Sequence, residues 1–128
     1  YRQQQTESAV AFNASHFDLM RDTAIGTQPH IGVTLHGVAG DLTHFHVLTS
    51  WSHERAFKSI RTSIRSALSR ALNASFDQRT WFSDSPSRKA VKDHKHFDWL
   101  MLEYFPGHRW HWVRAEDRDA AQRRQHQP

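Results

Sequence analysis

The chain of 128 residues has the length of one ordinary domain, and its 38% hydrophobic residues can bury a modest core. No run approaches the roughly 18 consecutive apolar residues of a membrane span, so we expect no membrane partner. The absence of cysteine excludes disulfide frameworks, thiolate metal sites and a cysteine nucleophile, and it fits an intracellular protein, cytoplasmic or, in a viral or eukaryotic setting, nuclear. The net charge of +4 favours an anionic partner such as nucleic acid.

The first half of the chain predicts a helix and a β-hairpin. Residues 9–12 are a short apolar run typical of a strand, and residues 16–24 follow as a short helix with Asn13 and Ser15 as candidate caps. Glycine and proline within residues 26–29 predict a break. Residues 30–38 and 42–50 then alternate between apolar and polar side chains around an Ala-Gly-Asp turn, which indicates two antiparallel strands.

The second half predicts two amphipathic helices. Residues 54–72 form the stronger one, with Ser52 as N-cap and apolar side chains at helical spacing at Phe57, Ile60, Ile64, Leu68 and Leu72. Residues 81–82 are expected as a further strand. A last helix begins after Asp93 and ends at Phe105, because Pro106 and Gly107 cannot continue it. The elements together predict an α+β fold, a small antiparallel sheet with helices packed on its faces.

His44-Phe45-His46 is the first motif with chemical potential. In a strand His44 and His46 share one face, about 6.5 to 7 Å apart, and two imidazoles there can converge on one metal ion. The alternative is a pair of histidines on the solvated face of a sheet, since 11 histidines make roughly one such pair expected by chance. His94 and His96 repeat the spacing at the start of a helix, where residues two apart do not face each other.

Tyr104 is the second motif. It is the sole tyrosine besides Tyr1, it ends the last predicted helix, and His108 follows four residues later. One interpretation is a core tyrosine whose hydroxyl reaches the surface. The other is a nucleophile, which requires a nearby cation or base because a free phenol has a pKa of about 10.

Basic and aromatic side chains provide candidate contacts to nucleic acid. The predicted helix over residues 54–72 carries cations mostly off its apolar stripe, which either contact phosphates or serve solubility. Trp99 is expected in the core, whereas the tryptophans after Tyr104 are candidates to stack on unpaired bases. The predicted DNA-binding residues are Lys58, Arg61, Arg65, Arg109, Trp110 and Trp112.

These motifs in this order resemble the HUH endonucleases, which nick and join single-stranded DNA in rolling-circle replication, conjugation and transposition. The family hallmark is His-hydrophobic-His on a strand, then a helix, then a later helix with the catalytic tyrosine, and His44-Phe45-His46 and Tyr104 match it. The resemblance spans about residues 9–113. It departs from many replication initiators at Gly107, where they carry a lysine, while His108 fits the transposase-like pattern of a metal ligand four residues after the tyrosine.

The resemblance implies an HUH-type nuclease domain over residues 1–113, related to ferredoxin-like or RRM-like sandwiches. It further implies Mn²⁺ or Mg²⁺ held by His44, His46 and His108, and attack by Tyr104 on single-stranded or hairpin DNA to leave a 5′-phosphotyrosine. A single usable tyrosine indicates a homodimer or a second molecule for a complete cycle. Residues 114–128 are rich in Arg, Asp, Gln and Ala without an apolar stripe, so they are expected as a polar tail, a solvated helix or a linker to a missing domain. Because the chain begins at Tyr1 without methionine, we expect it to be a piece of a longer protein.

Two alternatives stay open at this point. One is a non-catalytic basic nucleic-acid-binding module with the same fold, which predicts salt-sensitive binding without metal dependence. The other is a histidine-rich metal enzyme of cupin type, against which the long helix over residues 54–72 argues, because a cupin barrel would continue with strands.

Overall fold

The computed structural model describes residues 11–54, 56–82 and 89–127. Within these residues the fold is α+β, with four α-helices and a three-stranded antiparallel sheet of order β2-β1-β3. The elements are α1 (Ala14–Ile31), β1 (Thr34–Gly40), β2 (Phe45–Ser50), α2 (Phe57–Ser75), α3 (His94–Trp99), the π-helical turn η1 (Leu100–Tyr104), β3 (Trp110–Val113) and α4 (Ala115–Gln125). None of the described helices is both long and apolar enough to span a membrane.

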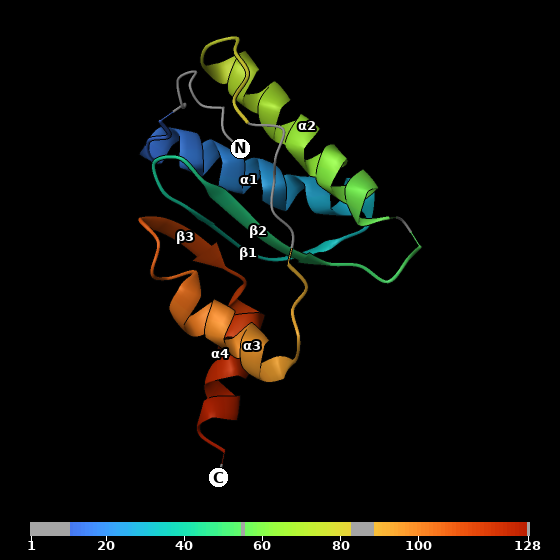
Figure 1. Ribbon diagram of the computed structural model, residues 1–128, viewed down its shortest axis with the longest axis vertical. Coiled ribbons are helices and arrows are strands. Elements are labelled where there is room, and N and C mark those ends of the chain that lie inside the picture. The colour runs from blue at the N-terminus through green and yellow to red at the C-terminus, as the bar shows by residue number, and fades with distance from the viewer. Residues whose placement is uncertain (1–10, 55, 83–88, 128) are drawn as a thin grey trace.

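The sheet separates two helical layers (Figure 1). On one face α1 packs against β1 and α2 packs on α1, around a core that includes Leu35 and Val38. On the other face α3, η1 and α4 enclose a second cluster around Ala39, Met101 and Phe105. Val38 and Ala39 are neighbours in β1 and enter different clusters, because successive side chains of a strand point to opposite faces.

Helix α1 is capped by Asn13, one of the two predicted caps, and it begins at Ala14 and extends past the predicted break; the other candidate cap, Ser15, lies inside the helix. The Asn13 side chain accepts a hydrogen bond from the His16 N–H at 2.9 Å, and the His16 ring accepts one from the Asn13 N–H, so the two residues form a capping box. Of the predicted first strand, residues 9 and 10 lie outside the described part, and Phe12 is in no strand. It is buried against Trp81 and other residues of the first core.

The break predicted at residues 26–29 is wrong, since α1 continues through Pro29 to Ile31. Pro29 lacks the N–H that would bond the Ile25 carbonyl, and the Gln28 side-chain amide donates to that carbonyl instead, at 3.0 Å. The helix ends at Gly32, whose φ of 68° is the left-handed conformation that glycine adopts at a C-cap.

The predicted hairpin is confirmed, with β1 and β2 antiparallel and shorter than the predicted strands. Its register contains one irregularity, because Leu35 pairs with Thr49 and Gly37 with Leu48, which leaves His36 as the extra residue of a β-bulge. The bulge resets the side-chain alternation, so that Val38 joins Leu35 on the α1 face. The simple alternation read over residues 30–38 does not anticipate this reset.

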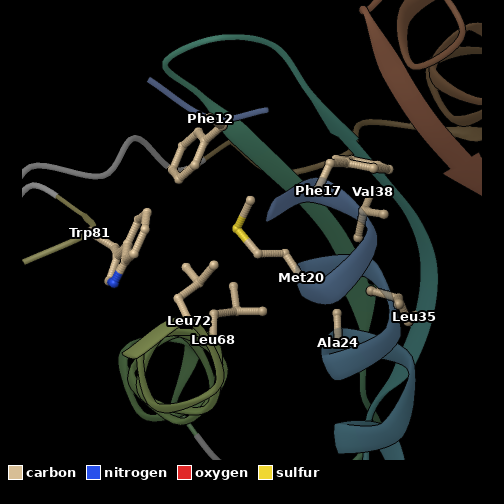
Figure 2. Packing of buried hydrophobic residues seen from close by; sticks show 9 residues of the cluster. All are labelled: Phe12, Phe17, Met20, Ala24, Leu35, Val38, Leu68, Leu72 and Trp81. Carbon is tan, nitrogen blue, oxygen red and sulfur yellow. The ribbon is translucent and has the colours of Figure 1, made fainter. Parts of the chain in front are cut away.

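Helix α2 confirms the predicted stripe, and Figure 2 shows Leu68 and Leu72 meeting Met20 of α1 in the first core. The helix starts at Phe57 without a side-chain cap, so the Ser52 cap is wrong. The strand predicted over residues 81–82 is also absent from the described residues. Trp81 is instead buried in an irregular segment, with its indole N–H donating to Asn73 Oδ1 at 2.8 Å.

The C-terminal residues, expected as a polar tail, a solvated helix or a linker, form a helix, α4, that packs on the second cluster. Ala121 is fully buried in the second cluster, and the Arg124 guanidinium donates to both carboxylate oxygens of the buried Asp98 in α3. These contacts hold α4 against α3 and η1 (Figure 1).

Candidate functional site

Strand β2 directs His46 toward the layer that contains Tyr104. Phe45 and Val47 pack on the α1 side, whereas Leu48 belongs to the cluster beneath η1, so the alternation puts His46 on that second face. The His44 ring lies parallel to the His46 ring, 6.1 Å between centroids and 7° between planes. The two imidazoles are therefore neighbours on one side of the hairpin, as the spacing predicts.

Tyr104 is positioned by a π-helical turn that continues α3. Asp93 caps α3 as predicted, by accepting the His96 N–H at 2.8 Å. From Leu100 onward the hydrogen-bonding pattern changes, and the Phe105 N–H donates to the Leu100 carbonyl five residues back, at 2.9 Å. Such π-turns occur frequently at functional sites. Tyr104 ends this turn and is 36% exposed.

Phe105 fixes the tyrosine segment to the sheet through Gly37. The Phe105 ring is buried against β1, and a Cβ atom built on Gly37 would lie only 2.8 Å from Phe105 Cδ2. The absence of a side chain at residue 37 is therefore what admits the ring. This close approach holds the segment that carries Tyr104 against β1.

His108 closes the site through a hydrogen bond to the backbone of Tyr104. Its Nδ1 lies 2.8 Å from the Tyr104 carbonyl oxygen. Because a carbonyl oxygen can only accept, Nδ1 carries the proton of this hydrogen bond. A hydrogen bond from one ring nitrogen to a carbonyl is the arrangement in which the other ring nitrogen of a histidine ligates metal ions. The His108 ring lies 4.8 Å from the Tyr104 ring and 4.8 Å from the His46 ring, and 5.9 Å separate His46 from Tyr104.

Asp41 orders the turn that carries His44. Its carboxylate accepts the N–H groups of Thr43 and His44, at 3.2 and 3.1 Å. Partial burial alone would raise the pKa of Asp41, but these donors and the charges of His44 and His108 outweigh it, so the pKa lies below its usual value. His44 Nδ1 lies 2.8 Å from the Thr43 hydroxyl, and the side chain is 71% exposed.

His46 is the histidine of the site with a shifted pKa. Burial lowers its pKa below 6.5, and the nearby His108 and His44 lower it further, while Asp41 acts in the opposite direction. The ring is therefore neutral at pH 7 and has a lone pair for a metal ion or a proton.

The donor chemistry fits a divalent metal, whereas the present side-chain positions do not enclose one. Imidazole nitrogens suit Mn²⁺ better than Mg²⁺, which prefers oxygen ligands. Within the described residues, however, no group of three or more histidine, aspartate or glutamate side chains is arranged to hold an ion. Metal binding by His44, His46 and His108 stays a prediction.

Trp99 belongs to this site, although it was expected in the core. It is 48% exposed, and its ring lies 5.1 Å from the Tyr104 ring. The sequence contained a signal for this position, because residue 99 lies off the apolar stripe formed by Phe97, Leu100 and Met101. Trp99 is therefore the site residue that the sequence analysis placed wrongly, in the core instead of beside Tyr104.

All the predicted DNA-binding residues except Arg109 lie on α2 or pack on the α1 side of the sheet, and the structure does not bring them together with the tyrosine. Lys58, Arg61 and Arg65 are on α2, which packs on α1 on the opposite side of the sheet from η1 (Figure 1). Arg61 and Arg65 line an open groove of about 430 Å³ there, together with the hydroxyl groups of three neighbouring residues and with Arg70. This basic groove is therefore on a helix across the sheet from Tyr104.

The two tryptophans of β3 also point away from Tyr104. Trp110 stacks on Phe17 at 6.1 Å between ring centroids, and Trp112 packs against the same α1-side cluster. Both are partly buried. Arg109 is exposed in the turn beside His108, so among the predicted contacts it is the one adjacent to the site.

A second hydrogen-bonded cluster joins α4 to the sheet. His36 Nδ1 lies 2.7 Å from Asp117 Oδ2, and His36 Nε2 lies 2.6 Å from the Ser50 hydroxyl. This order matches the relay of serine hydrolases, but Arg114 already donates to both carboxylate oxygens of Asp117, at 2.8 and 3.0 Å. The guanidinium neutralises the charge that would stabilise a protonated His36. We assign the cluster to holding α4 in place.

Comparison with protein-family models, with curated proteins and with solved structures finds no match. The resemblance to HUH endonucleases therefore depends on the motifs and on how the chain arranges them.

Proposed function

We propose that the protein is a metal-dependent HUH-type endonuclease that nicks and rejoins single-stranded DNA with Tyr104 as nucleophile. One observation carries the proposal. Tyr104 and His108 at the end of η1 and His46 on β2 lie within 4.8 to 5.9 Å of one another, measured between ring centroids, although about 60 residues of chain separate the two segments. A partly exposed tyrosine beside imidazole nitrogens that could accept a proton or hold a metal ion suits nucleophilic attack by a phenol.

In the proposed reaction the Tyr104 hydroxyl oxygen bonds to the phosphorus and the bond from phosphorus to the 3′ oxygen breaks. The phenolic proton is lost to solvent, and the departing 3′ oxygen takes up a proton. The DNA is then linked through its 5′ phosphate to Tyr104, and attack by a 3′-hydroxyl reverses the step and rejoins the strand. Mn²⁺ or Mg²⁺, held by His44, His46 and His108, would supply Lewis-acid polarisation of the phosphate.

Two features of the chain prepare these residues for their roles. The hydrogen bond from His108 Nδ1 to the Tyr104 carbonyl fixes the orientation of the ring and leaves Nε2 as the nitrogen that would ligate a metal ion. The lowered pKa of His46 keeps its ring unprotonated at neutral pH, so protons do not compete with a metal ion.

The test is covalent capture from a random pool of labelled single-stranded DNA in the presence of Mn²⁺. We expect a protein–DNA adduct that survives denaturation, that EDTA prevents, and that Tyr104→Phe abolishes. Tyr1→Phe is the matched control, because it removes the other tyrosine of the chain and should leave the adduct intact. An adduct that persists in Tyr104→Phe would contradict the nucleophile assignment.

A specific observation favours a second candidate, a non-catalytic nucleic-acid-binding module. The basic groove on α2 lies apart from Tyr104, and the histidines of the described residues form no ready ion site. This candidate predicts salt-sensitive DNA binding that Mn²⁺ leaves unchanged and that Arg61→Ala weakens, with no covalent adduct.

A further inference from the structure

We propose that Trp99 is a stacking platform for one nucleobase of the single-stranded DNA, next to the phosphate that Tyr104 attacks. This inference rests on the proposed function and adds a base-binding subsite to it. Trp99 and Tyr104 are two of the four large hydrophobic side chains that are exposed in the described residues, and they are in contact with each other. An exposed indole beside a nucleophile is a surface on which any base can stack.

The π-turn is what brings the two rings together. An α-helix advances about 100° per residue, so side chains five residues apart point about 140° away from each other. The i to i+5 hydrogen bonding of η1 adds a residue to the turn and brings position 104 back over position 99. The ring planes meet at 35° with 5.1 Å between centroids, and Trp99 is still 48% exposed.

The surroundings of Trp99 suit a nucleotide. His96 is a second ring neighbour of Trp99, 6.2 Å away between ring centroids and tilted by 31°, so aromatic rings from α3 and η1 cluster around the indole. Lys95 is exposed and stands one helical turn before Trp99, on the same helix face. Exposed aromatic rings flanked by a cation are an arrangement with which proteins bind unpaired bases and the backbone between them.

Solvent exposure makes Trp99, and not Trp110 or Trp112, the stacking surface for a base. The two tryptophans of β3 are partly buried against the α1-side cluster, so a base has access to little of their ring faces. Trp99 makes its contacts with His96 and Tyr104 while almost half of its surface stays in solvent.

The experiment uses the Tyr104→Phe protein, so that binding is measured without cleavage. An oligonucleotide is selected from the random pool by affinity for this protein, and its binding is measured with a single abasic site moved along the sequence. We expect Trp99→Ala in this background to weaken binding roughly 5- to 150-fold and Trp99→Phe to weaken it much less. The abasic site that weakens binding to the Trp99 protein should cause no further loss in Trp99→Ala.

The control is Phe76→Leu, which alters another exposed aromatic residue at the end of α2. Equal affinity of Trp99→Ala and its parent, or an abasic effect of the same size in both, would overturn the platform. These results are separable from those on catalysis, because an adduct on Tyr104 with no effect of Trp99 retains the proposed function and removes the platform. Trp99-dependent binding without any adduct would retain Trp99 as a base-binding residue and contradict the proposed endonuclease function.

Discussion

Replacing Gly37 with alanine tests how the tyrosine segment is seated on the sheet. The new methyl group would lie 2.8 and 2.9 Å from two carbons of the Phe105 ring and 3.2 Å from the Trp112 carbonyl oxygen. Real Cβ atoms do not approach that closely, and Phe105 is buried, so the ring and the backbone of η1 must shift. Overpacking of this kind costs about 1–3 kcal/mol.

Gly26→Ala is the matched control, because residue 26 lies in α1 and a Cβ there meets nothing within 4 Å. Alanine in the interior of a helix should stabilise the protein by about 0.5–1 kcal/mol. Urea unfolding followed by circular dichroism measures both variants, and the two changes should have opposite signs. The adduct yield should fall in Gly37→Ala at temperatures where it stays folded, because Tyr104 is bonded directly to Phe105 and must move when Phe105 shifts. A stable Gly37→Ala protein with full adduct yield would refute the seating argument.

Three further predictions follow from the hydrogen bonds and the histidines. Burial raises the pKa of Asp117, but hydrogen bonds from Arg114 and His36 outweigh burial and lower the pKa below 3.8. The ionised Asp117 therefore stabilises the folded protein above pH 3.8, and this stabilisation is lost as the pH falls through the folded-state pKa. The acid limb of the urea midpoint against pH should therefore be shallower in Asp117→Asn, and an identical limb would contradict the assignment. Gln28→Ala should destabilise the fold by about 1–3 kcal/mol in urea unfolding, because the Gln28 side chain accepts the buried Leu35 N–H at 2.7 Å, and a neutral effect would contradict that role. Mn²⁺ at a hundred times its dissociation constant should stabilise the parent by about 2.7 kcal/mol, measured by thermal unfolding, and His46→Ala should lose this gain; an equal gain in both would place the ion elsewhere.

Local sequence patterns predicted the elements whose signals lie within a few residues. The hairpin followed from alternation, the stripe of α2 from helical spacing, and the start of α3 from Asp93 as a cap. The shared face of His44 and His46 followed from the same two-residue period.

The parts that sequence reasoning missed depend on distant partners. α1 continues through Pro29 because Gln28 donates to the Ile25 carbonyl, and the same side chain is fixed by Leu35 seven residues away. α4 has almost no apolar stripe and is held by the contact of Arg124 with Asp98, 26 residues earlier. No spacing rule reports such pairs.

The candidate site divides in the same way. Its residue types were visible in the sequence, and so was the spacing of His44 and His46. The π-turn was not, because its hydrogen bonds appear in no local motif, and it is the π-turn that brings Tyr104 over the exposed Trp99.

The role of Tyr104 as nucleophile is decided by identifying the atom to which DNA becomes linked. The adduct formed with Mn²⁺ is digested with protease and nuclease, and the modified peptide is sequenced by mass spectrometry. We predict a nucleotide joined through its 5′ phosphate to Tyr104, with a free 3′-hydroxyl on the released strand that a polymerase can extend. A linkage to any other residue, or DNA that is cut without a linkage to the protein, would contradict the account.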